Sequence, residues 1–166
     1  MLLRTNADFA AVLEWQAEPE ARMPFDKLGE PRNADLLVHA RDDNGPFLIA
    51  VEAKGNETFG STVAQILAAA RERKAENPHS NAEARALSLL TLVLGAPCDV
   101  SATDGAIRYQ LLTATAGLLA AASEGIDRVV LLVQEFRSPA TKDRKHDANA
   151  RDLDRFTSRL SGGALS

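Results

Sequence analysis

The sequence predicts a single α/β domain in which helices cover both faces of a mixed sheet. Two apolar, strand-like runs, residues 34–40 and 46–54, are separated only by turn residues, which is typical of a β-hairpin. Helical segments follow the hairpin, and an apolar run at residues 127–136 then adds a further strand. The chain length of 166 residues, with 45% hydrophobic and 25% charged residues, fits one globular domain over residues 1–166.

The N-terminal part of the chain is expected to hold one helix and one uncertain segment. Residues 6–18 predict a helix that is capped by Asn6. Its apolar face consists of Phe9, Val12 and Leu13. The segment at residues 20–31 is ambiguous and fits a short edge strand with a loop.

Two helices are expected directly after the hairpin. Residues 61–77 predict a helix that begins at a Ser61 cap and is stopped by Pro78. Residues 81–95 predict a second helix, which begins at an asparagine cap and ends at a glycine.

The remaining elements complete the sheet and close the chain. Residues 103–125 predict a long helix rich in alanine and leucine, which should be largely buried. The run at residues 127–136 is nearly continuous in Leu and β-branched residues, which is typical of a strand covered on both faces. An amphipathic helix near residues 148–161 ends the chain. Its inward residues are Leu153, Phe156 and Leu160.

Charge and cysteine content narrow the classes of function. The net charge of −4 argues against a protein that holds nucleic acid by bulk charge, although carboxylates that bind a divalent metal would make a nuclease acidic. The single cysteine, Cys98, allows no intrachain disulfide and favours a reducing cytoplasm. We find no signal peptide and no apolar run near the roughly 18 residues of a membrane span. Motifs of nucleotide triphosphatases, dehydrogenases, zincins and α/β-hydrolases are also missing from the sequence.

The hairpin brings two acidic residues and a lysine together at one end. A loop at residues 43–44 places Asp35 opposite Glu52, whereas a loop at residues 44–45 places Asp35 opposite Lys54. Because side chains alternate along each strand, either register puts these three residues on one face. The other face receives Leu36, Val38, Ile49, Val51 and Ala53.

This arrangement suits metal-assisted hydrolysis of a phosphodiester. Two facing carboxylates repel each other unless a cation lies between them. Magnesium is held by one or two carboxylates together with phosphate oxygens of a substrate. Lys54 would share the face and orient a water or stabilise a developing oxyanion. The alternative is a solvated hairpin end at which Glu52 and Lys54 simply pair.

Asp35 followed by Glu52-Ala53-Lys54 at the end of an apolar strand resembles the PD-(D/E)xK nuclease superfamily, which has the restriction-endonuclease-like fold. The resemblance covers about residues 8–136 and implies a mixed central sheet with a catalytic hairpin and flanking helices. By position, Asp35 and Glu52 would bind Mg²⁺ or Mn²⁺. Lys54 would be the catalytic lysine, and the carbonyl of Ala53 a further metal ligand.

The resemblance extends to the segments "AVEAKGNETFG" and "RYQLL", which are similar to those of bacterial members. Asn33-Ala34 stands where the name-giving pattern has a proline before Asp35, and the helix near residues 82–94 looks like an insertion. The implied partner is nucleic acid, with DNA the expected substrate and a homodimer as one option. An inactive nuclease fold that serves as a binding or partner subunit is the alternative.

Five further residues are candidates for a supporting role. Glu57 either completes the metal site or is an ordinary loop carboxylate. Gln65 and Glu14 lie on helices that could reach the site, but exposed positions are the simpler interpretation. Arg108 and Gln110 lie in the first turns of a buried helix and need partners, either as capping groups, at the hairpin end or on phosphate.

Basic residues and histidines give weaker indications. The best candidates for contact with nucleic-acid phosphate are Lys142, Arg144 and Lys145. Ordinary solvated charge explains this segment equally well. The three histidines are scattered without the spacing of a zinc site. They are His39, expected to be buried in the core, His79 in a loop, and His146 in a charged tail.

Overall fold

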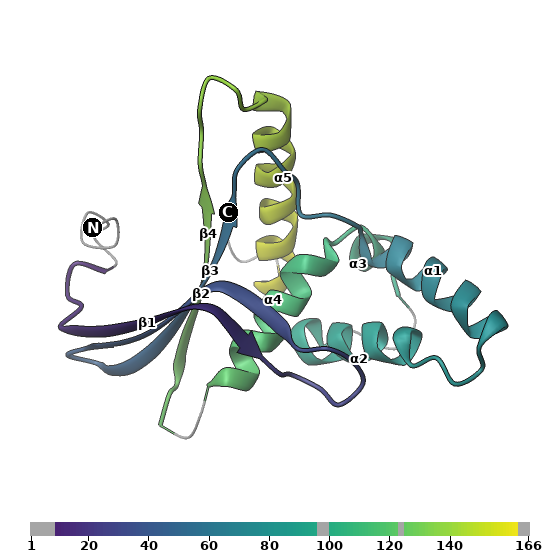
Figure 1. The fold of residues 1–166 in the computed structure, drawn as a ribbon, viewed down its shortest axis with the longest axis horizontal. Helices are drawn as coiled ribbons and strands as arrows, with labels where there is room; N and C mark the ends of the chain where they lie inside the picture. Colours follow the sequence, from purple (N-terminus) through teal and green to yellow (C-terminus); the bar gives the residue numbers. More distant parts are fainter. Residues whose placement is uncertain (1–8, 96–99, 123–124, 163–166) are drawn as a thin grey trace.

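The computed structural model describes residues 9–95, 100–122 and 125–162, and within them four strands form one mixed sheet (Figure 1). The strands are β1 (Glu14–Met23), β2 (Arg32–Asp42), β3 (Gly45–Lys54) and β4 (Arg128–Glu135), in the spatial order β1-β2-β3-β4. The first three strands are antiparallel neighbours, and β4 runs parallel to β3. The predicted mixed sheet, its hairpin and its later strand are therefore confirmed.

The helices are α1 (Val63–Glu76), α2 (Ala82–Leu94), α3 (Ala102–Gly105), α4 (Tyr109–Ala121) and α5 (Asp143–Leu160). The cap of α1 is Thr62 rather than the predicted Ser61, since the Thr62 side chain accepts a hydrogen bond from Gln65 N–H and the Gln65 side chain accepts one from Thr62 N–H. The helix α2 runs between its predicted ends and stops at Gly95, whose φ of +60° suits glycine. Among the described residues, no helix has the length and apolarity needed to cross a membrane.

The predicted first helix is wrong over its second half. Val12 N–H still bonds to the carbonyl of Phe9, but Leu13 N–H bonds to the carbonyl of Arg41, and from Glu14 onward the chain pairs with β2 as an edge strand. Pairing with a neighbouring strand thus overrides a helical spacing of apolar residues. The cap predicted at Asn6 lies outside the described residues.

The long helix predicted over residues 103–125 is interrupted. Arg108 has an extended backbone and forms an isolated bridge with Thr62. Val63 N–H bonds to the carbonyl of Ile107, and Tyr109 N–H bonds to the carbonyl of Ser61. The backbone between α3 and α4 therefore pairs with the segment that leads into α1.

The described helices lie on one side of the sheet, which corrects the expectation of helices on both faces (Figure 1). On that side Leu118 of α4 packs against Leu37, Leu48 and Ala50 of the hairpin. A separate cluster on the opposite face has no member from a helix of the described chain. Its buried members are Phe9, Val38, Ala40, Phe47 and Ile49.

The alternation of side chains between the two faces of the sheet is broken at Glu20 in β1 and at Asp35 in β2. Ala34 and Leu37 pack into the same cluster under α4, although strict alternation would put residues three apart on opposite faces. The change falls between the pairs Pro19–Leu36 and Ala21–Ala34, where Glu20 has a φ of +51°. Before Asp35, the even-numbered residues of β2, such as Ala34, therefore face the helices. After Asp35, the odd-numbered residues, such as Leu37, face them.

Candidate functional site

The hairpin register is the one with the loop at residues 43–44. Asp42 pairs with Gly45, and the ladder continues to the pair Leu36–Val51. Beyond that pair, the Asp35 side chain replaces the backbone as the hydrogen-bond partner of β3. Its Oδ2 accepts a hydrogen bond of 2.6 Å from Ala53 N–H. Asp35 is exposed, and in the described chain it forms no ion pair with Lys54 within 4.0 Å. It therefore lies beside the Glu52–Lys54 segment and is bound to its backbone.

Glu52 and Lys54 form a buried ion pair at the end of β3. Each residue is only 3% exposed, and Lys54 Nζ donates to Glu52 Oε1 at 2.7 Å. Both face the helices, and the ring of Phe59 lies 5.5 Å from Lys54 Nζ. A buried pair of charges is not a solvated hairpin end, because exposed partners would keep most of their hydration.

Two more side chains bind the Glu52 carboxylate. Arg32 Nη2 donates to Glu52 Oε2, and Gln110 Nε2 donates to Glu52 Oε1. Gln110 was a supporting candidate from the sequence, and the structure brings it to the hairpin end. Arg32 was missed, because unbroken alternation along β2 would place it on the face opposite Asp35. The change of facing at Asp35 instead turns Arg32 toward Glu52.

An open hollow of about 330 Å³ adjoins this cluster. Arg32, Gln110 and Thr113 line it next to Glu52, and Arg32 Nη1 donates weakly to Thr113 Oγ1 at 3.4 Å. The rest of its lining comes from the loop before α1, from α1 and from α4: Phe59, Gly60, Ser61, Ile66 and Tyr109. Burial raises the pKa of Tyr109 from its ordinary value, so its hydroxyl stays protonated near neutral pH.

A second polar cluster, formed by Glu135, His146 and Asn149, joins β4 to α5 next to Lys54. Lys54 pairs with Glu135 in the parallel register of β3 and β4. Glu135 Oε2 lies 2.8 Å from His146 Nδ1, and Glu135 Oε1 accepts from Asn149 Nδ2 at 2.7 Å. Burial works to raise the pKa of Glu135, but the hydrogen bonds from Asn149 and His146 outweigh it and the pKa falls below its ordinary value. His146 is 1% exposed, so it is a core residue and not part of a charged tail.

The loop after Lys54 is tied to the same helix. Asn149 Nδ2 also donates to the carbonyl of Glu57 at 2.9 Å, and Lys145 Nζ donates to the carbonyl of Asn56. Lys142 N–H bonds to the Asn56 side chain at 3.3 Å. Glu57 itself is brought to the site, with its Oε1 3.6 Å from Lys54 Nζ and its side chain 63% exposed.

Three other supporting candidates have different surroundings. Arg108 binds Asp152 of α5 at 2.6 Å and the carbonyl of Gly60, so it fastens α5 to the loop before α1. Gln65 forms the capping box of α1 on the exposed surface. Glu14 lies on β1 opposite Arg41, at the far end of β2 from Asp35. The candidates Lys142, Arg144 and Lys145 lie at the start of α5, two of them in contact with the loop after Lys54.

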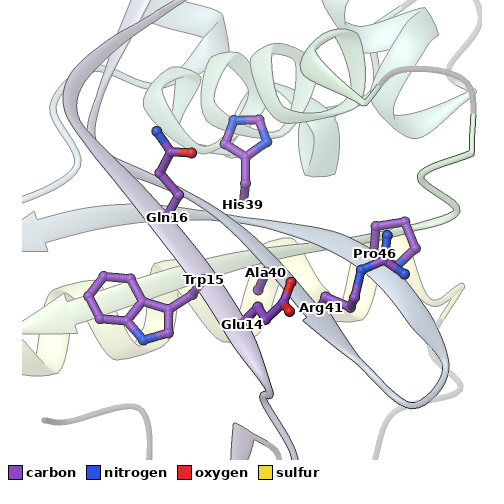
Figure 2. A pocket seen from close by; sticks show the side chains of 7 residues that line it. All are labelled: Glu14, Trp15, Gln16, His39, Ala40, Arg41 and Pro46. Atoms are coloured by element: carbon purple, nitrogen blue, oxygen red, sulfur yellow. The ribbon is translucent and has the colours of Figure 1, made fainter.

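A second hollow of about 360 Å³ lies at that far end, between β1 and the turn of the hairpin. Figure 2 shows Gln16 and His39 projecting side by side from their paired positions, with Trp15 pointing away from them. His39 is exposed there, so the expectation of a buried core histidine is wrong. His79 lies exposed in the loop after α1, and Cys98 lies outside the described residues.

The donor set at the hairpin end suits a hard cation that also binds a substrate. In the part of the chain that the structure describes, no group of three or more His, Cys, Asp or Glu side chains is arranged to hold a metal ion. Asp35 and Glu52 do offer two carboxylates beside the backbone of Ala53, and Mg²⁺ needs only one or two carboxylates when phosphate and water complete its shell. The residue types match the ligands that Mg²⁺ takes, and Glu52 Oε2 already accepts a hydrogen bond from Arg32.

These features define an α/β protein whose four-stranded mixed sheet carries a buried Glu–Lys pair at the end of its hairpin. The chain belongs to the family described as a domain of unknown function, DUF6946, whose model matches residues 1–165. No curated protein and no solved structure matches the chain.

Proposed function

We propose that the protein is a metal-dependent phosphodiesterase that cleaves nucleic acid, with Asp35, Glu52 and Lys54 at its active site. The observation that carries this proposal is the burial of Glu52 and Lys54, each 3% exposed, at the end of a strand beside a second acidic residue, Asp35. Burying a pair of charges costs desolvation energy that their attraction often does not recover. Buried charged groups beside an open hollow therefore favour a chemical role over a purely structural one.

The fold supports the proposal at a coarse level. Three antiparallel strands, a set of helices and a fourth strand parallel to β3 are compatible with the restriction-endonuclease-like fold that the sequence resembles. The proposed catalytic residues lie at the carboxyl end of β3, next to the equivalent end of its parallel neighbour β4. Open α/β sheets commonly bind ligands at that edge.

Each residue of the site has a distinct role in this proposal. Asp35, Glu52 and the carbonyl of Ala53 hold Mg²⁺ or Mn²⁺, which supplies Lewis-acid polarisation of the phosphodiester when bound. Gln110 donates to Glu52 Oε1 and fixes the orientation of the carboxylate. Lys54 Nζ, held by Glu52, donates a hydrogen bond to the attacking water or to the oxygen on which negative charge develops. Glu57 Oε1 lies 3.6 Å from the same amine.

Local charge supports nucleic acid as the substrate despite the net charge of −4. Lys142, Arg144 and Lys145 start α5, and two of them contact the loop that follows Lys54. Basic residues beside the site suit contacts to the phosphate backbone, which position a nucleic acid on the protein.

Cleavage assays with a matched lysine control test the proposal. Purified protein is incubated with plasmid, single-stranded DNA and single-stranded RNA in Mn²⁺ and in Mg²⁺. We expect the wild type and Lys27→Met, which changes an exposed lysine, to cleave at least one substrate. Lys54→Met should lose this activity while circular dichroism shows that its fold persists. Cleavage by a folded Lys54→Met at the wild-type rate would refute the proposal.

The alternative is a nuclease-like domain that binds a partner without catalysis. It is favoured by one observation, that both oxygens of Glu52 already accept hydrogen bonds from Arg32, Lys54 and Gln110. Thermal unfolding with and without Mn²⁺ separates the two functions. A nuclease should be stabilised by Mn²⁺, and Asp35→Ala should abolish this effect, whereas a binding subunit should show no such dependence.

A further inference from the structure

We propose that Arg32 binds a phosphate of the substrate, and that it pairs with Glu52 while no substrate is bound. The inference rests on the proposed function, because the phosphate belongs to the nucleic-acid substrate of the same site. It assigns the hollow beside Glu52 to a phosphate group of the nucleic acid and its adjoining nucleoside. It also makes the release of Arg32 from Glu52 a condition for cation binding.

The position of Arg32 results from the change of facing in β2. Ala34 packs under α4, and Arg32, two residues earlier, faces the same side. There its Nη2 binds Glu52 Oε2, while Nη1 makes only a long hydrogen bond of 3.4 Å to Thr113 Oγ1. Its Nε is buried and has no partner within the described chain. The guanidinium therefore has donors that Glu52 does not use.

Burial makes Arg32 dependent on an anion. Its side chain is 13% exposed, and its Nη2 pairs with the Glu52 carboxylate. A buried guanidinium that lost Glu52 would need another anion in reach. Phosphate is a suitable replacement, because arginine binds its oxygens with two parallel donors.

The adjoining hollow provides the place for that anion. Arg32 and Gln110 lie on its wall next to Glu52, and the hydroxyl-bearing residues Ser61, Tyr109 and Thr113 add further polar lining. Phe59 and Ile66 give it an apolar part. A hollow of about 330 Å³ with this mixture suits a phosphate and the nucleoside attached to it.

Arg32 and a metal ion compete for one oxygen. Glu52 Oε2 accepts from Arg32, and Oε1 accepts from Lys54 and Gln110, so a cation on Oε2 would lie beside the guanidinium, and like-charge repulsion favours displacement of Arg32. Binding of the cation thereby frees Arg32 for the hollow, and a phosphate in the hollow draws Arg32 away from Glu52. Cation and substrate phosphate consequently favour each other's binding through this one side chain.

Calorimetric titration with Mn²⁺ alone tests the competition. Arg32→Gln removes the charge but keeps a donor near Glu52, and we expect it to bind Mn²⁺ about tenfold more tightly than the wild type, a factor within the usual range of such couplings. Arg32→Lys keeps a cation in the core, so it should tighten Mn²⁺ binding less. Arg85→Gln is the matched control, because Arg85 is similarly part-buried and pairs with Asp26 at 2.8 Å, and it should bind Mn²⁺ as the wild type does.

Binding of a short fluorescent oligothymidylate in Ca²⁺ tests the phosphate role. We expect Arg32→Gln to weaken this binding about tenfold, as for loss of a charged phosphate contact, while Arg85→Gln leaves it unchanged. Tighter Mn²⁺ binding together with weaker oligonucleotide binding supports the inference. If Arg32→Gln does not fold, the same opposite changes in Arg32→Lys, at smaller size, decide the question.

Failure of the inference differs from failure of the proposed function. Mn²⁺ binding that Glu52→Gln abolishes, but that neither Arg32 variant tightens, would overturn the role of Arg32 and leave the metal site in place. Unchanged oligonucleotide binding in the Arg32 variants would also overturn it. No Mn²⁺ binding by the wild type or by any Arg32 variant would overturn the proposed function and this inference together.

Discussion

His146 Nδ1 lies 2.8 Å from Glu135 Oε2, and this contact joins the first turn of α5 to the strand position paired with Lys54. Asn149, one turn further along α5, donates both to Glu135 and to the carbonyl of Glu57. The helix therefore holds the end of β4 and the loop after Lys54 in one hydrogen-bonded unit. The position of Glu57 beside Lys54 depends on a helix that is distant in sequence.

Asn149→Ala should destabilise the protein by about 1–3 kcal/mol, since it removes a buried donor from the hydrogen bonds to Glu135 and to the carbonyl of Glu57. Urea unfolding measures the loss. The control is Arg151→Ala, on the exposed side of the same helix, which should change stability by less than about 0.5 kcal/mol. Equal stability of Asn149→Ala and Arg151→Ala would show that these hydrogen bonds do not fasten the loop.

The cap of α1 gives a second prediction. Thr62→Ala should cost about 1 kcal/mol, because the Thr62 hydroxyl accepts from Gln65 N–H at 3.3 Å and is the capping group. Ser61→Ala should have little effect, since Ser61 precedes the cap and is exposed. Chemical denaturation of both variants compares the two adjacent residues directly, and a larger loss in Ser61→Ala would contradict the assignment.

The hairpin turn gives a prediction on pH. Arg128 donates to both oxygens of Asp42, at 2.6 and 2.9 Å, and these hydrogen bonds lower the pKa of Asp42 although partial burial opposes them. Because the folded pKa is below the unfolded value of about 3.9, the stabilisation is present above pH 3.9 and is lost as pH falls through the folded pKa.

Thermal unfolding of Asp42→Asn over a pH series checks this prediction. Its Tm should lie below that of the wild type at neutral pH, and the difference should shrink below about pH 3.9. Asp43→Asn changes the exposed neighbour in the turn and serves as the control. A Tm difference for Asp42→Asn that stays constant down to acidic pH would show that the ion pair with Arg128 does not contribute.

The sequence narrowed the hairpin register to two possibilities, a loop at residues 43–44 or at residues 44–45, because a short turn fixes all later pairs. The loop at residues 43–44 sets the sum of paired positions, and the structure follows it to Leu36 and Val51. The residue that meets Glu52 could not be predicted in this way. Alternation fails at Asp35, where β1 and β2 change facing together, and that change depends on the neighbouring strand β1, in which Glu20 has a φ of +51°.

Local patterns also misassigned two helical segments for tertiary reasons. The helical spacing of Phe9, Val12 and Leu13 indicated a helix that would continue through residues 14–18, but β2 offers those residues a strand partner. The chain at Arg108 could continue a helix, yet its backbone bridges to Thr62. His146 appeared to lie in a charged tail because the helix was expected to start near residue 148. The helix begins at Asp143 instead, and its earlier start turns His146 inward.

The burial of the Glu52 cluster leads to the last prediction, which concerns the apo protein. Glu52→Gln should destabilise it by about 3–5 kcal/mol, because Arg32 and Lys54 would remain buried without their shared carboxylate. Urea unfolding at neutral pH, without divalent metal, measures this loss. Glu57→Gln is the matched control, since Glu57 is 3.6 Å from Lys54 but largely exposed, and its loss should stay below about 1 kcal/mol. Similar stability of the two variants would mean that solvent reaches Glu52. The burial of Glu52 and Lys54 would then no longer favour a chemical role for them.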